Sequence, residues 1–396
     1  MEAPRREPLQ VHAGPIREQG APQLSAVLAE SLRRAQDADP FVLTHGFHAW
    51  PARMHPATAR VLVRELAKPG ARVLDPFMGS GTVLLEAMLA GHRSAGIDLN
   101  PLASLLTRVR CDPRTPDEGR ELRHTARLVG EASEERVRSR APAHAAIPKE
   151  MTRLHPGHVL KEMAGLLEEI ELVEDARDRA ALRVCFSSNV VKLSTKRGDS
   201  SEAQMPKRLR KGLVTEFFVR KAEELSERQV ALGLELPRDY QTPRTFLGDA
   251  RRADALLGSR VRVDLVLTSP PYGGTYDYVE HHALRLAWMG MDASEMEKSE
   301  IGSRRGLVGQ SAFERWDKQL YGVLEAIRHV LDRQGLLVMV VGDGFIEQTL
   351  VPALGQLARI APSAGLELVA SASQQRPDWR GEHPRDEHVV ALQLAI

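Results

Sequence analysis

The chain has 396 residues, of which 42% are hydrophobic and 27% charged, a composition typical of a globular protein of two or three domains. No apolar run approaches the roughly 18 residues of a membrane-spanning helix, and the N-terminal MEAPRREPLQ lacks the apolar region of a secretory signal, so a cytoplasmic protein is expected. The net charge of +1 means that a nucleic-acid partner would need a local basic patch. Two cysteines, Cys111 and Cys185, without a CxxC pair argue against a zinc site, and no metal site is predicted.

The first part of the chain changes from an irregular segment to alternating elements. Residues 1–24 are rich in Pro, Gly, Arg and Glu without periodicity and are predicted to form a flexible arm. Within residues 25–111, strands are expected at 72–75 and 93–98, and helices at 79–92 and 101–110. The last helix is expected to begin at Pro101, because proline suits the first helical turn.

The alternation resumes within residues 243–396. Strands are expected at 245–249, 263–268, 335–343, 366–371 and 388–396, and an amphipathic helix at 313–331. Strands that alternate with helices predict an α/β fold with a doubly wound, mostly parallel sheet. The last two strands lack a helix-length spacer, which predicts an antiparallel hairpin at one edge of the sheet.

Residues 112–242 interrupt this pattern and are predicted to form an inserted helical, basic subdomain. Within it, residues 192–221 contain nine Lys and Arg against three Asp and Glu. This local charge favours a target-recognition surface for nucleic acid, although an ordinary solvated face is the alternative. The residues expected to contact phosphates rather than read bases are Lys196, Arg197, Lys207, Arg208 and Arg210.

The stretch RVLDPFMGSGT places a glycine loop where the first strand of the alternation ends and a helix begins. An ordinary strand-to-helix turn is the alternative for this loop alone. Asp98 ends the next strand, where a carboxylate can bind the hydroxyls of a ribose. A dinucleotide fits poorly, because Leu84 replaces the third glycine and Asp75 would repel a pyrophosphate. A cofactor with a ribose, an adenine and a cationic group fits better, which indicates S-adenosylmethionine.

The motif TSPPY follows the expected strand at 263–268, and its two prolines are poor residues for continuing a sheet. The series DPFMGSGT, GIDLNP, GDA and TSPPY resembles the motifs of the S-adenosylmethionine-dependent amino-methyltransferases of DNA. The serine of TSPPY resembles the cytosine-N4 branch, whereas the adenine-N6 branch usually has DPPY or NPPY. FHAWPARMHP, residues 47–56, also resembles the segment that covers the methionine end of the cofactor. The resemblance spans residues 45–110 and 243–345.

The resemblance implies a seven-stranded, Rossmann-like methyltransferase sheet and a set of cofactor contacts. The residues that would line the methionine and adenosine path are Asp75, Phe77, Gly79 and Gly81. Asp98 would hold the ribose and Asp249 would meet the adenine amino group. A turn or a helix cap is the alternative role for each of these acids.

The TSPPY motif also suggests how an exocyclic base amine could be methylated. Such an amine is a poor nucleophile, because its lone pair is delocalised into the ring. Ser269 Oγ and the Pro270 carbonyl could accept its two hydrogens, with Pro270 and Pro271 fixing the direction of that carbonyl. Tyr272 would stack against a base that has left the duplex. A strand-ending Pro-Pro turn with a packed tyrosine is the structural alternative.

These features together predict a site-specific methyltransferase that modifies the N4 amine of a flipped cytosine in double-stranded DNA. A cognate restriction endonuclease is a candidate partner, and the oligomeric state is not predicted. The cofactor loop precedes the TSPPY motif, whereas many cytosine-N4 enzymes have the reverse order. Adenine-N6 methylation of DNA and guanine-N2 methylation of RNA therefore stay open. A non-catalytic nucleic-acid-binding module is the alternative from a different functional class.

Overall fold

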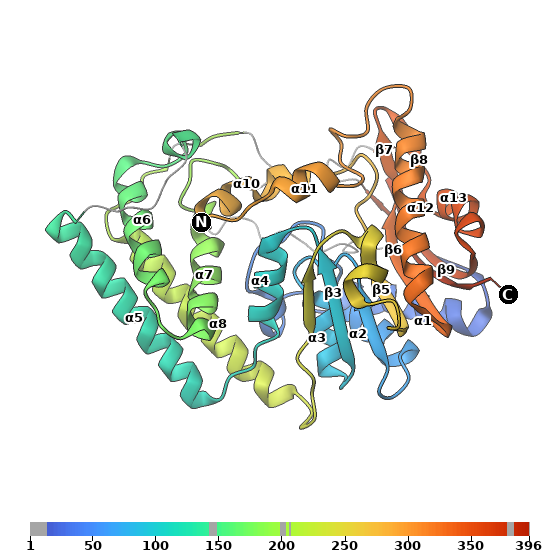
Figure 1. The fold of residues 1–396 in the computed structure, drawn as a ribbon, viewed down its shortest axis with the longest axis horizontal. Helices are drawn as coiled ribbons and strands as arrows, with labels where there is room; N and C mark the ends of the chain where they lie inside the picture. The colour runs from blue at the N-terminus through green and yellow to red at the C-terminus, as the bar shows by residue number, and fades with distance from the viewer. Residues whose placement is uncertain (1–13, 142–148, 199–202, 206, 378–383, 396) are drawn as a thin grey trace.

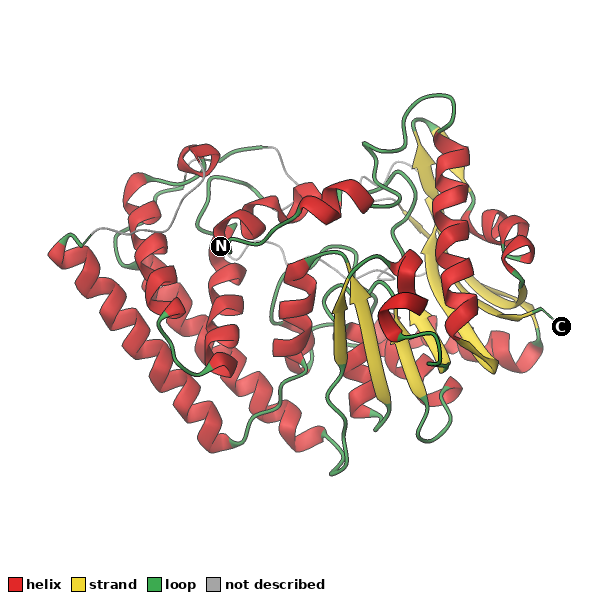
Figure 2. Cartoon of the chain, in the orientation of Figure 1, coloured by secondary structure: helices red, strands yellow, loops and turns green. Residues whose placement is uncertain are grey.

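The computed structural model describes residues 14–141, 149–198, 203–205, 207–377 and 384–395, and these residues contain one eight-stranded sheet. The strands are β1 (Ile16–Gly20), β2 (Arg72–Asp75), β3 (Arg93–Asp98), β4 (Arg244–Leu247), β5 (Val263–Thr268), β6 (Leu331–Gly342), β9 (Leu366–Pro377) and β10 (Pro384–Leu394). Their order is β1-β9-β10-β6-β5-β2-β3-β4 (Figures 1 and 2). A separate small hairpin pairs β7 (Gly344–Ile346) with β8 (Thr349–Val351).

The five strands β2 to β6 pair in parallel, and β10 is antiparallel to both β6 and β9. This arrangement confirms the predicted mostly parallel sheet and its antiparallel hairpin. The expected strand at 263–268 coincides with β5, and the helix expected at 101–110 is α4 (Pro101–Arg110). Both boundaries were predictable because a proline marks each of them locally.

Helices cover both faces of the sheet, so its central strands are apolar on both sides. One face packs against α1 (Pro22–Asp37), α2 (Pro56–Leu66) and α3 (Thr82–Leu89). The other face packs against α9 (Ala253–Leu257), α12 (Ala312–Val330) and α13 (Ala353–Ile360). On β5, Leu265 and Leu267 face the first group and Val266 faces the second. This is the alternation expected of a strand.

The prediction of a flexible arm was wrong for its second half. Residues 1–13 lie outside the described residues, but β1 pairs antiparallel with β9, and α1 begins at Pro22. The strand was not recognised because only Ile16 of its five residues is partly buried. An edge strand of this kind is held by backbone hydrogen bonds, which leave no hydrophobic pattern. Because β1 adds an edge strand, the sheet has eight strands instead of the expected seven, and the β9–β10 hairpin lies one strand in from the edge.

The segment 112–242 is helical where it is described. Its helices are α5 (Pro116–Ser139), α6 (Gly157–Glu171), α7 (Ala176–Val190) and α8 (Leu213–Glu235). They share a core with α4 and with α10 (Tyr278–Trp288), and they lie at the end of the molecule opposite the β9–β10 hairpin (Figure 1). α7 contacts two neighbours through Ser187, whose hydroxyl is 3.1 Å from His48 Nε2 and whose carbonyl accepts from Arg285 Nε at 3.3 Å. The insert is thus attached beside the expected cofactor site.

Among the described residues, no helix combines the length and the apolarity that crossing a membrane requires.

Candidate active site

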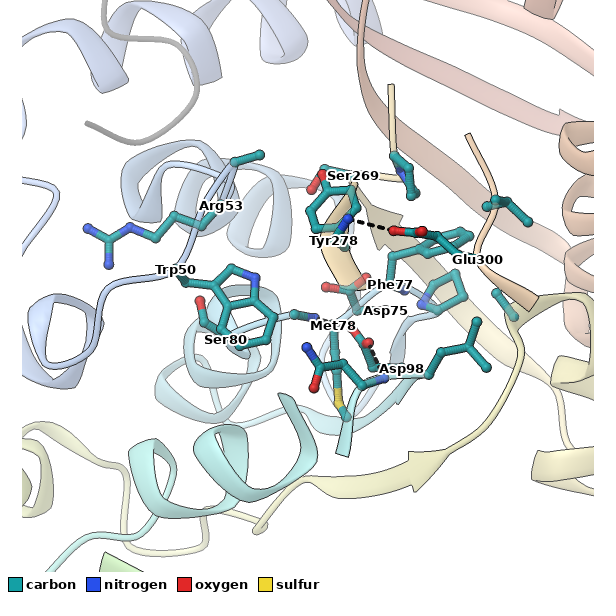
Figure 3. A pocket seen from close by; sticks show the side chains of 18 of the residues that line it. Trp50, Arg53, Asp75, Phe77, Met78, Ser80, Asp98, Ser269, Tyr278 and Glu300 are labelled. Carbon is teal, nitrogen blue, oxygen red and sulfur yellow. Dashed lines mark hydrogen bonds between the residues drawn. The ribbon is translucent and has the colours of Figure 1, made fainter. Parts of the chain in front are cut away.

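A cavity opens at the carboxyl ends of the parallel strands, the position where open α/β sheets bind ligands (Figure 3). It encloses about 890 Å³, counted to its open mouth. Residues predicted from the sequence that line it are Trp50, Asp75, Phe77, Gly79, Asp98, Asp249, Ser269 and Pro271. The structure therefore brings the glycine loop and the TSPPY motif, almost two hundred residues apart, to one cavity.

The glycine loop needs glycine at both predicted positions, for different reasons. Gly79 has φ 47°, and a Cβ added there would come within 2.9 Å of Trp50 Nε1. Gly81 has φ 80°, and its Cβ would meet Thr107 at 2.7 Å. Gly79 faces the cavity beneath the covering tryptophan, whereas Gly81 allows α3 to start close to α4. Gly81 does not line the cavity itself.

Asp98 anchors the glycine loop from the end of β3. Its two carboxylate oxygens accept hydrogen bonds from the backbone N–H groups of Gly79 and Asn100, each at 2.8 Å. Burial raises the pKa of Asp98 to about 6, against the lowering effect of these two donors. The carboxylate lies at the cavity wall with a fixed orientation, as a ribose-binding acid requires.

Asp75 connects the two predicted motifs directly. Its Oδ1 accepts a hydrogen bond from Thr268 Oγ1 at 2.6 Å and another from the Phe77 N–H at 3.0 Å. Thr268 is the last residue of β5, so this contact joins the start of the glycine loop to the start of TSPPY. Burial raises the pKa of Asp75 to about 7, more than its hydrogen bonds lower it.

Asp249 lines the cavity but already has strong partners. Its Oδ1 accepts from the Arg251 N–H at 2.9 Å, which caps a short helical turn. The guanidinium of Arg251 also donates to both carboxylate oxygens, at distances of 2.6 to 3.0 Å. The cap proposed as the alternative role is therefore present, and any cofactor contact would share the carboxylate with Arg251.

A buried polar network joins the turn just before the covering segment to the glycine loop. The guanidinium of Arg110 donates to the Thr44 carbonyl at 2.9 Å and also to the Ser80 carbonyl. Its third contact, 3.2 Å from His45 Nδ1, makes that nitrogen an acceptor, so His45 Nε2–H donates to Glu86 at 2.9 Å. Burial lowers the pKa of His45 to about 4, which keeps the imidazole neutral. The sequence alone did not indicate this network.

The four residues of SPPY separate into two environments. Ser269 and Pro271 line the cavity, whereas Pro270 is buried and Tyr272 is absent from the cavity wall. The Tyr272 hydroxyl donates to Glu387 Oε1 at 2.8 Å, so the side chain extends toward the β9–β10 hairpin. Stacking of Tyr272 on a base stays a prediction, and it would occur outside the cavity that contains Asp75 and Asp98.

Several cavity residues have no motif in the sequence. Tyr278, at the start of α10, lines the same cavity as Ser269 (Figure 3). Glu300 follows α11 (Ser294–Ser299) and accepts from the N–H groups of Tyr278 at 2.6 Å and Val279 at 3.3 Å. Burial raises the pKa of Glu300 to about 7. These residues reach the site through tertiary packing, and no local spacing could have identified them.

The five predicted phosphate contacts also differ in environment. Arg197 and Arg208 are exposed, and Lys196 is half-buried. Arg210 is exposed and pairs with Glu216. Lys207 Nζ lies 3.0 to 3.4 Å from the carbonyls of Val191, Lys192 and Lys196. Lys207 therefore supports the loop that carries the other cations.

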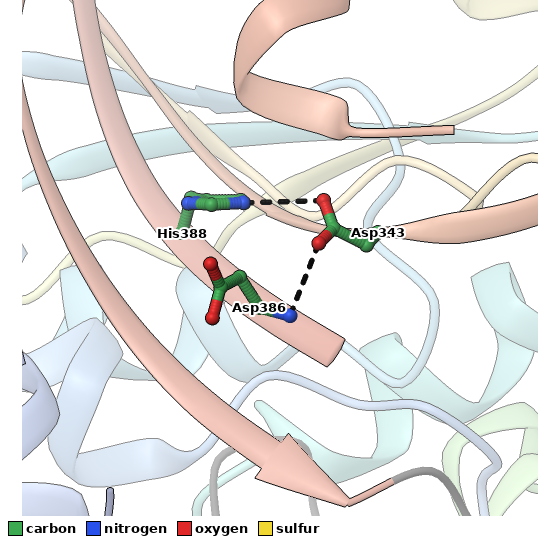
Figure 4. Close-up of side chains that lie close together, drawn as sticks. All are labelled: Asp343, Asp386 and His388. Atoms are coloured by element: carbon green, nitrogen blue, oxygen red, sulfur yellow. Dashed lines mark hydrogen bonds and ion pairs between the residues drawn. The ribbon is translucent and has the colours of Figure 1, made fainter. Parts of the chain in front are cut away.

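A separate polar cluster lies where the sheet meets the segment after β6 (Figure 4). Asp343, Asp386 and His388 come within reach of a single ion. Protein groups already occupy them: His388 Nε2 lies 3.3 Å from Asp343 Oδ1, and Arg17 pairs with Asp386 at 2.5 Å. The Ala353 N–H also donates to Asp343 Oδ1 at 2.9 Å. These contacts connect β1, β10 and α13, and we assign the cluster a structural role.

The cavity fits the polar cofactor expected from the sequence. Ser80 Oγ, Thr82 Oγ1 and Asn100 Nδ2 belong to lining residues and are buried without a hydrogen-bond partner in the described part of the chain. Buried polar atoms of this kind indicate a ligand with matching groups. At Gly79 a Cβ would meet Trp50, so the absence of a side chain leaves space at the cavity wall. Together with the carboxylates of Asp75 and Asp98 at the strand ends, this space forms a site suited to a cationic nucleoside.

Comparisons with known proteins agree with this assignment for part of the chain. Residues 23–105 match a family model described as DNA methylase. The chain is similar to the Type II methyltransferase M.MvaI of Kocuria varians, 38% identical over 79 residues, which are 19% of this chain and 17% of the relative. It is also similar to the Type II methyltransferase M.BsoBI of Geobacillus stearothermophilus, 23% identical over 256 residues, 58% of this chain and 49% of the relative.

A third similarity is to a tRNA (guanine(10)-N2)-dimethyltransferase of Methanothermobacter thermautotrophicus, 44% identical over 52 residues, 13% of this chain and 16% of the relative. Each of the three matches covers less than two thirds of the relative's length. The matched family segment contains the covering segment and the glycine loop but not TSPPY.

Replacing Gly79 with alanine should reduce S-adenosylmethionine affinity by ~10-fold or more, because the new Cβ would displace Trp50 and strain the backbone. Isothermal titration calorimetry measures this affinity. Gly70→Ala is the matched control, since Gly70 has φ 76° but nothing within 4 Å of an added Cβ. Equal affinity in the two variants would contradict the assigned role of Gly79.

S-adenosylmethionine affinity should increase as the pH rises from about 5.5 to 7.5, because Asp75, with a pKa of about 7, ionises and attracts the cation. The pH window ends below the pKa of a free α-amino group, so that the amine of the cofactor's methionine part does not titrate within it. Asp75→Asn should weaken binding at pH 7.5 and reduce this dependence to the part that comes from Asp98, whose pKa is about 6. The raised pKa also means that cofactor-free protein loses stability as pH rises toward 7, relative to Asp75→Asn. Identical pH profiles for parent and variant would exclude Asp75 from cofactor binding.

Proposed function

We propose that this protein transfers a methyl group from S-adenosylmethionine to the exocyclic N4 amine of a cytosine flipped out of double-stranded DNA. The observation that carries the proposal is the shared cavity wall formed by Asp75, Gly79, Asp98 and Ser269. The match of residues 23–105 to the DNA methylase family supports the DNA substrate. Because the relatives are covered only in part, the activity of the whole chain is inferred from the site.

When bound, the cofactor supplies a methyl group on a sulfonium that leaves as a neutral thioether. The chain provides position rather than a covalent intermediate. Trp50 and Gly79 would enclose the methionine end, and Asp98 would accept the ribose hydroxyls. The Asp75–Thr268 contact would keep the donor aligned with the motif that follows Thr268.

Ser269 Oγ and the Pro270 carbonyl would orient the target amine. Each accepts one N–H, which localises the nitrogen lone pair and directs it to the methyl carbon. The methyl group would pass to this nitrogen while the bonding pair stays on the sulfur of the cofactor, and the amine would lose one proton to solvent water. Both cysteines are buried with raised thiol pKa values, to about 12 for Cys111, so neither is suited to a thiolate mechanism on a ring carbon.

The basic loop of the insert would bind the phosphate backbone beside this site. Exposed Arg197 and Arg208 are the strongest candidates, followed by Lys196 and Arg210. Lys207 would contribute through the loop geometry that it maintains. A cognate endonuclease is part of the proposal because two of the relatives are Type II methyltransferases.

One observation favours a second candidate substrate. The similarity to the tRNA guanine-N2 enzyme is high where it occurs, 44% over 52 residues. Guanine in RNA carries an exocyclic amine to which the same pair of acceptors could bind. Adenine in DNA is the remaining candidate, since the serine that distinguishes the N4 branch is a single residue.

The deciding experiment incubates the protein with labelled cofactor and either DNA or RNA, followed by nucleoside analysis. N4-methylcytosine from DNA is the expected product. N6-methyladenine or methylguanosine would replace the proposed substrate with one of the two candidates above. A protein that binds the cofactor but transfers no label would be a binding module.

Ser269→Ala should keep the parent's cofactor affinity within about twofold and lose methyl transfer by roughly 100-fold, the effect of removing one preorganised hydrogen-bonding group. Single-turnover transfer and calorimetry measure the two quantities. Ser259→Ala, in the exposed turn before β5, is the control and should match the parent. Full transfer by Ser269→Ala would eliminate Ser269 as an acceptor.

Arg208→Gln should weaken DNA binding similarly for all sequences and reduce the dependence of log affinity on log salt by about 1. Fluorescence anisotropy at several salt concentrations measures the slope. Arg262→Gln is the control, since Arg262 is exposed at the opposite end of β5 from the cavity. An unchanged slope for Arg208→Gln would place the DNA elsewhere.

A further inference from the structure

We propose that Glu387, supported by Arg376, is a positioning residue that fixes Tyr272 as a preformed aromatic wall for the target base. This inference rests on the proposed function, because it assumes that TSPPY receives a nucleobase. Glu387 lies on β10 and Arg376 on β9, both in the C-terminal hairpin and more than one hundred residues from the motif. No motif in the sequence connects them with it.

The contacts form a chain of three side chains. The Tyr272 hydroxyl donates to Glu387 Oε1 at 2.8 Å, and Arg376 Nη1 donates to the same oxygen at 2.7 Å. Glu387 is only 1% exposed, so the arginine supplies the charge that a buried carboxylate needs. Burial, together with the adjacent Glu387, holds the pKa of Tyr272 well above its usual range, so its hydroxyl remains a donor.

The strand register explains how a residue at the end of β5 reaches β10. β6 lies between them, and Gly342 of β6 is directly opposite Glu387 in the antiparallel pair. The tyrosine ring crosses β6 at this glycine, because a Cβ on Gly342 would lie 2.4 Å from Tyr272 Cε2. From Gly342, over which the ring lies, Glu387 is one strand spacing away, roughly 4.8 Å, which the outer part of the phenol can bridge. Gly342 therefore leaves room for the Tyr272 ring, and Glu387 accepts a hydrogen bond from its hydroxyl.

The electrostatics indicate orientation rather than stability as the role of Glu387. Both donors bind Oε1, while Oε2 is buried without a hydrogen-bond partner among the described residues. Burying an ion pair with an unsatisfied oxygen contributes little to stability compared with an apolar pair of similar volume. The arrangement does specify the direction of the Tyr272 hydroxyl, and therefore the plane of its ring.

A ring fixed in advance has a direct consequence for base binding. The ring is held by the Gly342 surface at one point and by Glu387 at its hydroxyl. An incoming base then stacks on an ordered surface, without the entropy loss of immobilising the side chain. The effect should appear in binding of nucleic acid and in alignment of the amine, whereas the cofactor cavity, which Tyr272 does not line, should be unaffected.

A double-mutant cycle with Tyr272→Phe, Glu387→Met and the double variant tests this inference, because methionine keeps the length of the side chain and lacks the oxygen that accepts the hydroxyl. Each single variant should lower kcat/KM for DNA by ~10-fold, mainly through KM, as expected for loss of one hydrogen bond to a charged group. The kcat/KM of the double variant should be no lower than that of the less active single variant. Cofactor affinity should stay within about twofold of the parent, because the cavity is unchanged.

The chain offers a matched control on the exposed face of α12. Tyr321 donates to Glu325 at 3.1 Å, another tyrosine–glutamate pair, and neither residue lines the cofactor cavity. Tyr321→Phe and Glu325→Met should leave kcat/KM at the parent value. If Glu387→Met does not fold by circular dichroism, Tyr272→Phe carries the test, because it removes the same hydrogen bond and keeps the ring.

The outcomes separate this inference from the proposed function. A parent that methylates DNA, with Tyr272→Phe or Glu387→Met at full kcat/KM, would overturn the positioning role and leave the function intact. Losses that multiply in the double variant would also overturn it, because the two residues would then act independently. A parent without methyl transfer to DNA would overturn the proposed function, and the positioning role with it.

Discussion

The hydrogen bond from Thr268 Oγ1 to Asp75 Oδ1, 2.6 Å long and fully buried, is the contact on which the site depends. It joins the carboxyl ends of β2 and β5, two parallel neighbours at the centre of the sheet. The glycine loop and TSPPY begin at these strand ends, so a single interaction sets the separation of the two motifs. Because both partners are buried, water cannot replace the bond without a large cost in free energy.

The elements around this contact are fixed by buried polar groups rather than by hydrophobic packing alone. Arg110 binds the main-chain carbonyls of Thr44, just before the covering segment, and of Ser80 in the glycine loop, and Asp98 binds the amide of Gly79 from the other side. Such contacts are directional, whereas apolar contacts tolerate sliding. The glycine loop is thereby held in a conformation with positive φ at Gly79 and Gly81 before any ligand arrives.

The antiparallel end of the sheet contributes more than closure of the fold. Adjacent residues of β10 point to opposite faces, so Glu387 meets Tyr272 while its neighbour His388 binds Asp343. One strand thus supports the motif on one face and secures α13 on the other. The insert acts at the opposite end of the molecule, where α7 and α8 contact the covering segment through Ser187 and Lys221.

The sequence by itself determined the parallel sheet, the glycine loop and the approximate membership of the site. Those features are local: proline and glycine restrict the backbone within a few residues, and strand ends follow from short apolar runs. Strand β1 escaped detection because its side chains are exposed, and Glu300, Arg110 and Glu387 escaped because their partners are distant in the chain. Only the tertiary structure decided the orientation of Tyr272 and the supporting role of Lys207. The orientation of Tyr272 depends on the residue of the neighbouring strand that faces it, which the strand register decides. The role of Lys207 depends on the backbone carbonyls that the folded loop brings to its amine.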